Sequence, residues 1–188
     1  LYGELVPIPA ERVLVVEDRQ RLTLGRRTFE FIDAPGHARH HHCPIDLDHR
    51  DVYSGDNFGI CYRALDTQRG PFMLPPVQFD PDALHATIDR LMSYQPQRVL
   101  QTHFGPVSDL ERLARDLHAA LVELVRIARQ HAQAPDRRAR IEADMFRYFS
   151  VKLDEHGYRG DLAQRHALID EDVRLNTAGL ETWLNRSQ

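Results

Sequence analysis

The chain has 188 residues, of which 42% are apolar and 28% charged, and its formal net charge is −4 at pH 7. These proportions are typical of a globular domain, alone or with an appendage. The acidic balance leaves no broad basic surface, which argues against nucleic acid as a partner. No apolar run approaches the roughly 20 residues that cross a bilayer, so we expect no membrane span. We expect a cytoplasmic protein, although a segment ahead of Leu1 would carry any targeting signal.

The first half of the chain has the alternating pattern and turn residues of β-strands. The expected strands cover 12–16, 22–32 with a hairpin turn at 25–27, 43–47, 52–54 and 98–101. The segment 57–76 is rich in Gly, Pro and aromatic residues without periodicity, which predicts a long loop.

Helical patterns occupy most of the second half. Asp80 and Pro81 predict an N-cap and a first helical position, opening a helix that ends near Tyr94. Further helices are expected from 108 to about 134, over 138–155 and over 170–184, the last capped by Asp170. We therefore divide the chain into an α/β region, 1–107, and a helical region, 108–188.

Three short pieces each end an apolar run with a potential metal ligand. They are Ala34-Pro35-Gly36-His37, Ser54-Gly55-Asp56 and Gln101-Thr102-His103-Phe104-Gly105-Pro106. Neutral imidazole and carboxylate oxygen both bind Zn²⁺ or a similar first-row ion, so His37, Asp56 and His103 are candidate metal ligands.

In this order the pieces resemble the metallo-β-lactamase-fold hydrolases, a superfamily that includes glyoxalase II-type thioesterases and lactonases. The resemblance covers roughly the first 110 residues and implies an αββα sandwich, here with a C-terminal helical extension. It implies that His37 binds a first metal, that Asp56 bridges both metals as the catalytic carboxylate, and that His103 binds the second. His41 falls where the family has a second histidine that is normally not a ligand.

One family motif, His-x-His-x-Asp-His, belongs upstream of these pieces and is absent from the chain. More than half of the family's protein ligands are therefore missing. We interpret the chain as the C-terminal two-thirds of a longer hydrolase. The alternative is a natural half-site protein that binds metal weakly.

The resemblance implies two divalent ions, Zn with Fe or Mn as alternatives, and hydrolysis of a thioester, lactone or other ester through a metal-bound hydroxide. Tyr62 and Arg63 in the 57–76 loop are candidate contacts to a small-molecule substrate, because a hydroxyl or guanidinium can orient a carbonyl or an anionic group. Packing of the loop is an equally good interpretation of both side chains.

Two other functions stay open. One is an iron-dependent redox member of the same fold, similar to flavodiiron proteins or persulfide dioxygenases. The other is a non-catalytic binding or assembly module that acts through the helical tail, which resembles the family's C-terminal helices that roof the cleft or form a homodimer. Basic residues are arginines except for Lys152, a bias that suggests a GC-rich bacterial source.

Overall fold

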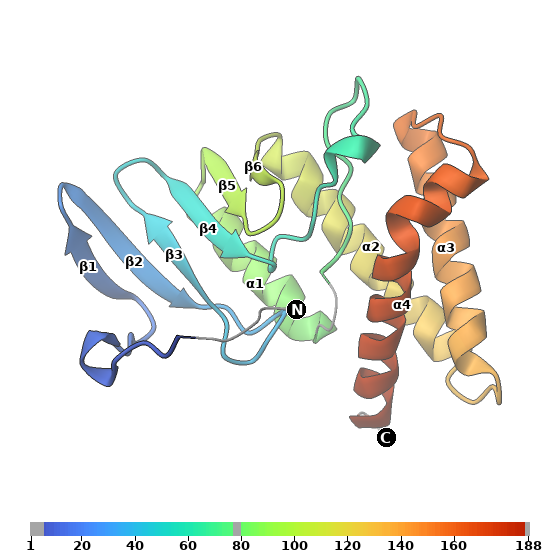
Figure 1. Cartoon of the computed structure of the whole chain (residues 1–188), viewed down its shortest axis with the longest axis horizontal. Coiled ribbons are helices and arrows are strands. Elements are labelled where there is room, and N and C mark those ends of the chain that lie inside the picture. Colours follow the sequence, from blue (N-terminus) through green and yellow to red (C-terminus); the bar gives the residue numbers. More distant parts are fainter. Residues whose placement is uncertain (1–5, 77–79, 187–188) are drawn as a thin grey trace.

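The computed structural model describes residues 6–76 and 80–186 and shows the expected mixed α/β architecture, with one sheet and four α-helices (Figure 1). The strands are β1 (Gln20–Leu24), β2 (Arg27–Asp33), β3 (His42–Asp46), β4 (Asp51–Gly55), β5 (Arg98–Gln101) and β6 (Gly105–Val107). The α-helices are α1 (Pro81–Ser93), α2 (Leu110–Gln130), α3 (Arg137–His156) and α4 (Leu162–Arg186). Short 3₁₀ turns cover Ala10–Arg12 and Arg63–Leu65.

The six strands follow one another in chain order across the sheet, and only the β4–β5 pair is parallel. α1 supplies the crossover that a parallel pair requires. Because antiparallel neighbours alternate, β2 runs in the same direction as β4 and β5. The carboxyl ends of β2, β4 and β5 therefore meet at one edge of the sheet, and each is followed by one of the three candidate metal-binding turns.

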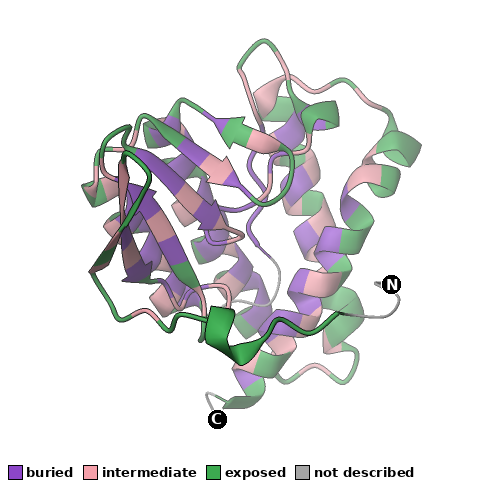
Figure 2. Cartoon of the chain, turned by 60° about the vertical axis from the view of Figure 1, so that its left-hand side comes forward, coloured by how far each residue is buried: buried purple, intermediate pink, exposed green. Residues whose placement is uncertain are grey.

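One face of the sheet is covered by helices. Leu84, Ile88 and Leu91 of α1 join Ile32 and Val52 of the sheet in one buried apolar cluster. The same cluster continues through α2, α3 and α4, so buried residues from both sides of position 107 pack together (Figure 2). None of the helices in the described part of the chain is long and apolar enough to span a membrane.

The opposite face of the sheet keeps a stripe of half-buried apolar side chains. Phe31 of β2 lies opposite Pro44 of β3, and Tyr53 of β4 lies opposite Leu100 of β5. Alternation along β2 turns Phe31 away from the face on which Ile32 is fully buried.

The prediction of a strand over 12–16 was wrong. Residues 13–16 have no strand pairing, and Val13, Leu14 and Val15 are 58%, 62% and 82% exposed. The three valines at 13, 15 and 16 favour extended backbone, but a strand forms only where a neighbouring edge offers hydrogen bonds.

Two further boundaries differ from the predictions. The short strand β6 forms in what was expected to be only a turn, because the reversal at Gly105 returns the chain along β5. α4 begins at Leu162 rather than 170, because Asp161 and Gln164 form a capping box. The Asp161 N–H donates a 2.8 Å hydrogen bond to Gln164 Oε1, and the Gln164 N–H donates one of 2.9 Å to Asp161 Oδ1. Asp170 therefore lies inside the helix and does not cap it.

Candidate metal centre

The turns after β2, β4 and β5 bring His37, Asp56 and His103 together. Asp56 Oδ2 lies 3.7 Å from His37 Nε2, and Asp56 Oδ1 lies 3.7 Å from His103 Nε2. Each carboxylate oxygen thus faces a different imidazole. His103 is 54% exposed against 20% for His37, so the group opens to solvent on the His103 side.

The free polar atoms of this group fit a cation. Asp56 Oδ1, the oxygen that faces His103 Nε2, is buried and has no hydrogen-bond partner among the described residues. His37 Nδ1 is also buried and unpaired among these residues, but the nitrogen of His37 that faces Asp56 is Nε2. Two ligand atoms at about 2.1 Å from a tetrahedral ion stand about 3.4 Å apart, so pairs at 3.7 Å need to close by only a few tenths of an ångström. Within 6–76 and 80–186, no group of three or more His, Cys, Asp or Glu residues is arranged to hold a metal ion. The two imidazoles face different oxygens of Asp56, so the three side chains do not converge on a single metal position.

Asn57 ties the aspartate turn to the first histidine turn. Its buried side chain accepts a 2.8 Å hydrogen bond from the His37 backbone N–H and donates one of 3.0 Å to the Ala34 carbonyl. Its amide nitrogen also lies 2.8 Å from His41 Nδ1. The position of the His37 ring relative to Asp56 therefore depends on Asn57.

Gln101 makes the second connection, between the aspartate turn and the second histidine turn. It ends β5, two residues before His103, and its side-chain amide donates hydrogen bonds of 2.8 and 2.9 Å to the carbonyls of Phe58 and Gly59. These carbonyls follow Asp56 in the chain. Sequence reasoning missed Asn57 and Gln101 as organising residues, although each stands within two positions of a candidate ligand.

His41 packs behind the candidate ligands. Its ring meets the His37 ring edge-on at 6.1 Å, and burial lowers the pKa of His41, which favours the neutral imidazole. Gly55, with φ of +55°, lets the chain pass this ring, since a Cβ there would stand 2.3 Å from His41 Nε2.

Tyr62 and Arg63 lie beside the His103 turn. The Arg63 guanidinium donates hydrogen bonds of 3.0 and 2.9 Å to the carbonyls of Phe104 and Pro106, and the Tyr62 ring lies 4.8 Å from the Phe104 ring. Phe104 has φ of +70°, a strained conformation that these contacts maintain. Arg63 therefore positions the turn, and its predicted contact with substrate stays a prediction.

The Tyr62 hydroxyl stays protonated at neutral pH. Burial, followed by the nearby Asp172 carboxylate of α4, raises the pKa of Tyr62 to about 12. The phenolic proton is shared with Asp172 in a hydrogen bond, which links the Tyr62 loop to α4.

An open cleft of about 800 Å³ adjoins His37. The turn 35–39 and the start of α1 line one side, and Gly179, Thr182 and Trp183 of α4 line another. A small molecule can reach His37 through this cleft, whose lining does not include Asp56 or His103.

The two cysteines take no part in the centre. Cys43 and Cys61 are free and buried, and burial raises the pKa of each thiol to about 12. Both thiols therefore stay protonated at neutral pH, and neither is among the candidate ligands.

Solved structures with the same fold include three proteins at low sequence identity. An archaeal metallo-beta-lactamase superfamily protein from Sulfolobus tokodaii matches 96% of this chain and 57% of its own, with 18% identity and a TM-score of 0.57. A metallo-beta-lactamase family protein from Thermus thermophilus matches 95% and 51%, with 15% identity and a TM-score of 0.59. A beta-lactamase domain protein from Burkholderia ambifaria matches 96% and 49%, with 19% identity and a TM-score of 0.58.

The chain has the metallo-β-lactamase fold, as its three turns predicted. It spans about half the length of these solved structures. No family model matches the chain, and no curated protein matches it.

Proposed function

We propose that the protein is a metal-dependent hydrolase of the metallo-β-lactamase superfamily that cleaves a thioester, lactone or other ester. The observation that carries the proposal is the position of Asp56, whose two oxygens face His37 and His103 at equal distances of 3.7 Å. A carboxylate between two imidazoles suits a bridge between two cations better than a ligand of one.

In this proposal His37 and His103 would each hold a divalent ion, and Asp56 would supply carboxylate oxygens to the same centre. Zn fits the nitrogen and oxygen donors, and Fe or Mn are alternatives. When bound, the ions supply Lewis acidity and lower the pKa of a water molecule toward neutrality. Tyr62 is the candidate substrate contact beside the second histidine turn, with its hydroxyl hydrogen-bonded to Asp172 of α4. Arg63 keeps His103 in place through the carbonyls of Phe104 and Pro106.

The remaining ligands are proposed to come from a longer protein. The stripe of half-buried apolar side chains, represented by Phe31, Pro44, Tyr53 and Leu100, suits the packing of a further layer against the sheet. The matched structures are about twice as long as the part that this chain covers, which leaves room for such a layer. A cytoplasmic, bacterial origin and a homodimer formed through the helical region belong to the same proposal.

The proposal is tested by activity on a panel of a thioester, a lactone and an aryl ester, with the native chain purified from its source. We expect hydrolysis of at least one substrate, loss of activity with a chelator, and recovery with Zn²⁺. His103→Ala should lower kcat/KM at least a hundredfold, whereas Asp89→Asn, a change at an exposed aspartate of α1, should leave it unchanged.

Three results would overturn this assignment. Hydrolysis that persists after the metal has been removed excludes a metal-dependent reaction. Bound iron with redox activity and no hydrolysis favours the redox alternative, and a metal-free, inactive and stable native chain favours a binding module.

A further inference from the structure

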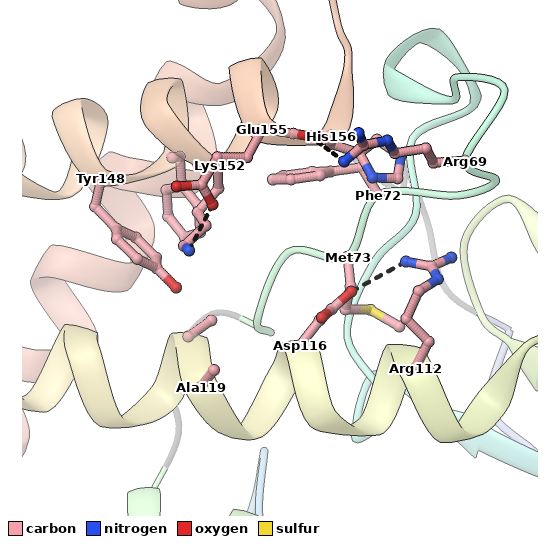
Figure 3. A pocket seen from close by; sticks show the side chains of 12 residues that line it. Arg69, Phe72, Met73, Arg112, Asp116, Ala119, Tyr148, Lys152, Glu155 and His156 are labelled. Carbon is pink, nitrogen blue, oxygen red and sulfur yellow. Dashed lines mark hydrogen bonds and ion pairs between the residues drawn. The ribbon is translucent and has the colours of Figure 1, made fainter.

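A second pocket lies away from the candidate metal centre, between α2, α3 and the chain segment 67–73 (Figure 3). It encloses about 260 Å³, and none of the three candidate ligands lines it. Phe72, Met73, Ala120 and Phe149 form apolar walls, and all four are buried. The exposed Ala119 stands at its α2 side.

The segment 67–73 is fastened to both helices, so the pocket is built before any ligand arrives. The Thr67 hydroxyl donates a 2.9 Å hydrogen bond to the His156 carbonyl at the end of α3, and His156 Nε2 lies 2.9 Å from the Gly70 carbonyl. On the α2 side, Arg112 donates a 3.2 Å hydrogen bond to the Pro71 carbonyl.

Most charged groups around the pocket are already paired. Arg112 bonds Asp109 and Asp116 through its other nitrogens, at 2.5 and 3.0 Å, and Arg69 bonds the Glu155 carbonyl. The lining holds Arg69, Arg112 and Lys152 against the carboxylates of Asp116 and Glu155, so the balance is one positive charge.

Two hydrogen-bond donors remain available, and Figure 3 shows that both point into the space between α3 and α2. The Lys152 ammonium uses one proton for its 2.7 Å contact with Glu155 and has two more. The Tyr148 hydroxyl makes no hydrogen bond with another described residue, and burial raises the pKa of Tyr148 to about 12, which keeps the phenol protonated.

We propose that this pocket binds a small amphipathic carboxylate. The carboxylate accepts hydrogen bonds from the Lys152 ammonium and the Tyr148 hydroxyl, and the apolar body packs against Phe72, Met73 and Phe149. A pocket just below the usual range of roughly 300 to 1,000 Å³ suits a ligand of about ten heavy atoms, such as an aryl or short branched acid. The thioether of Met73 and the ring of Phe72 favour an aromatic body.

Calorimetric titration with phenylacetate tests the proposal, with 2-phenylethanol as a neutral probe of similar shape. We expect phenylacetate to bind at one site and 2-phenylethanol to bind at least tenfold more weakly. Lys152→Met should raise the Kd of phenylacetate at least tenfold, because it removes the charge and keeps the length of the side chain. Arg147→Met, a matched loss of charge at an exposed position of α3 outside the pocket, should leave the Kd unchanged.

Chemical labelling gives an independent readout, because Lys152 is the one lysine in the sequence. Saturating phenylacetate should slow acetylation of Lys152 at least fivefold, measured by peptide mass spectrometry, and should leave the α-amino group unaffected. Ala119→Leu, which adds bulk at an exposed position of the wall, should abolish the protection without unfolding the protein.

Equal affinity for the two probes, or unchanged labelling of Lys152, would overturn the proposal. Binding that His37→Ala removes and Lys152→Met retains would also overturn it, since the carboxylate would then occupy the candidate metal centre. These results are independent of whether the protein hydrolyses esters.

Discussion

Two buried amide side chains hold the three turns of the candidate metal centre in register. Asn57 joins the turn of Asp56 to that of His37, and Gln101 joins the strand before His103 to the loop after Asp56. The positions of His37, Asp56 and His103 after apolar runs, together with the family resemblance, marked them in the sequence as candidate ligands. The two amides were not predictable, because their burial and partners depend on contacts 20 or more residues away in the chain.

Asn57→Ala should destabilise the protein and displace His37. The change leaves the His37 N–H and the Ala34 carbonyl without their partner, and each buried unpaired group costs about 1 to 3 kcal/mol. We expect a loss of about 3 kcal/mol in the free energy of unfolding, which for this chain length lowers Tm by about 6 to 12 °C. Thermal unfolding followed by circular dichroism measures the shift, and a loss below about 0.5 kcal/mol would contradict the assigned role.

Asp172 gives the stability a pH dependence. This α4 carboxyl is 4% exposed, and burial raises its pKa. Because the folded state favours the protonated acid, the wild-type protein loses stability as pH rises through the raised pKa. Asp172→Asn does not titrate, so it should raise Tm by several degrees at pH 8 and by less at pH 4.

The exposed neighbour provides the control for that comparison. Glu171 lies on the same helix, and its side chain is 64% exposed. Glu171→Gln should change the free energy of unfolding by no more than about 0.5 kcal/mol at both pH values. A Tm difference for Asp172→Asn that does not change between pH 4 and pH 8 would show that this carboxyl has an ordinary pKa.

At the scale of elements, local signals predicted most of the helices and strands. The β1–β2 hairpin and α1 appear where the alternation and the Asp80 cap placed them, with the Asp80 carboxylate accepting a 3.0 Å hydrogen bond from the Ala83 N–H. The strand over 12–16 does not form, and the start of α4 was placed eight residues too late. Composition gives a tendency toward extended or helical backbone, but pairing partners and reciprocal caps decide where an element forms.

Gly36, in the turn before His37, packs directly against Leu84 of α1. A Cβ at Gly36 would stand 2.5 Å from Leu84 Cδ1 and 2.7 Å from Leu84 Cα, so the α1 backbone has to move. Gly36→Ala should cost at least about 2 kcal/mol in the free energy of unfolding and lower the affinity for Zn²⁺. Denaturant unfolding and calorimetric Zn²⁺ titration measure the two effects.

Gly25→Ala is the matched control in the β1–β2 turn. Gly25 has φ of +64° with nothing within 4 Å of a Cβ, so alanine there meets backbone strain of about 1 kcal/mol and no clash. It should leave the Zn²⁺ affinity unchanged. Equal losses of Zn²⁺ affinity in both variants would show that the Gly36 contact does not position His37.

For the whole molecule, the direction of the strands explains why distant residues converge. β2, β4 and β5 run the same way and end at one edge, which brings together His37, Asp56 and His103 from positions up to 66 apart in the chain. The sequence indicated the order of these pieces, and the resemblance supplied the expectation that they meet. In the proposed longer protein, the further layer packs on the half-buried sheet face beside that edge.

The metal content of the native chain and of its Asp56→Asn variant is the most direct test of the proposed centre. Elemental analysis of both proteins, purified without added metal, should find Zn, Fe or Mn in the native chain and less than half as much in Asp56→Asn, because the amide removes the charge between His37 and His103. Asp89→Asn, the exposed control, should keep the native content. Equal metal content in all three proteins would contradict a metal centre at Asp56.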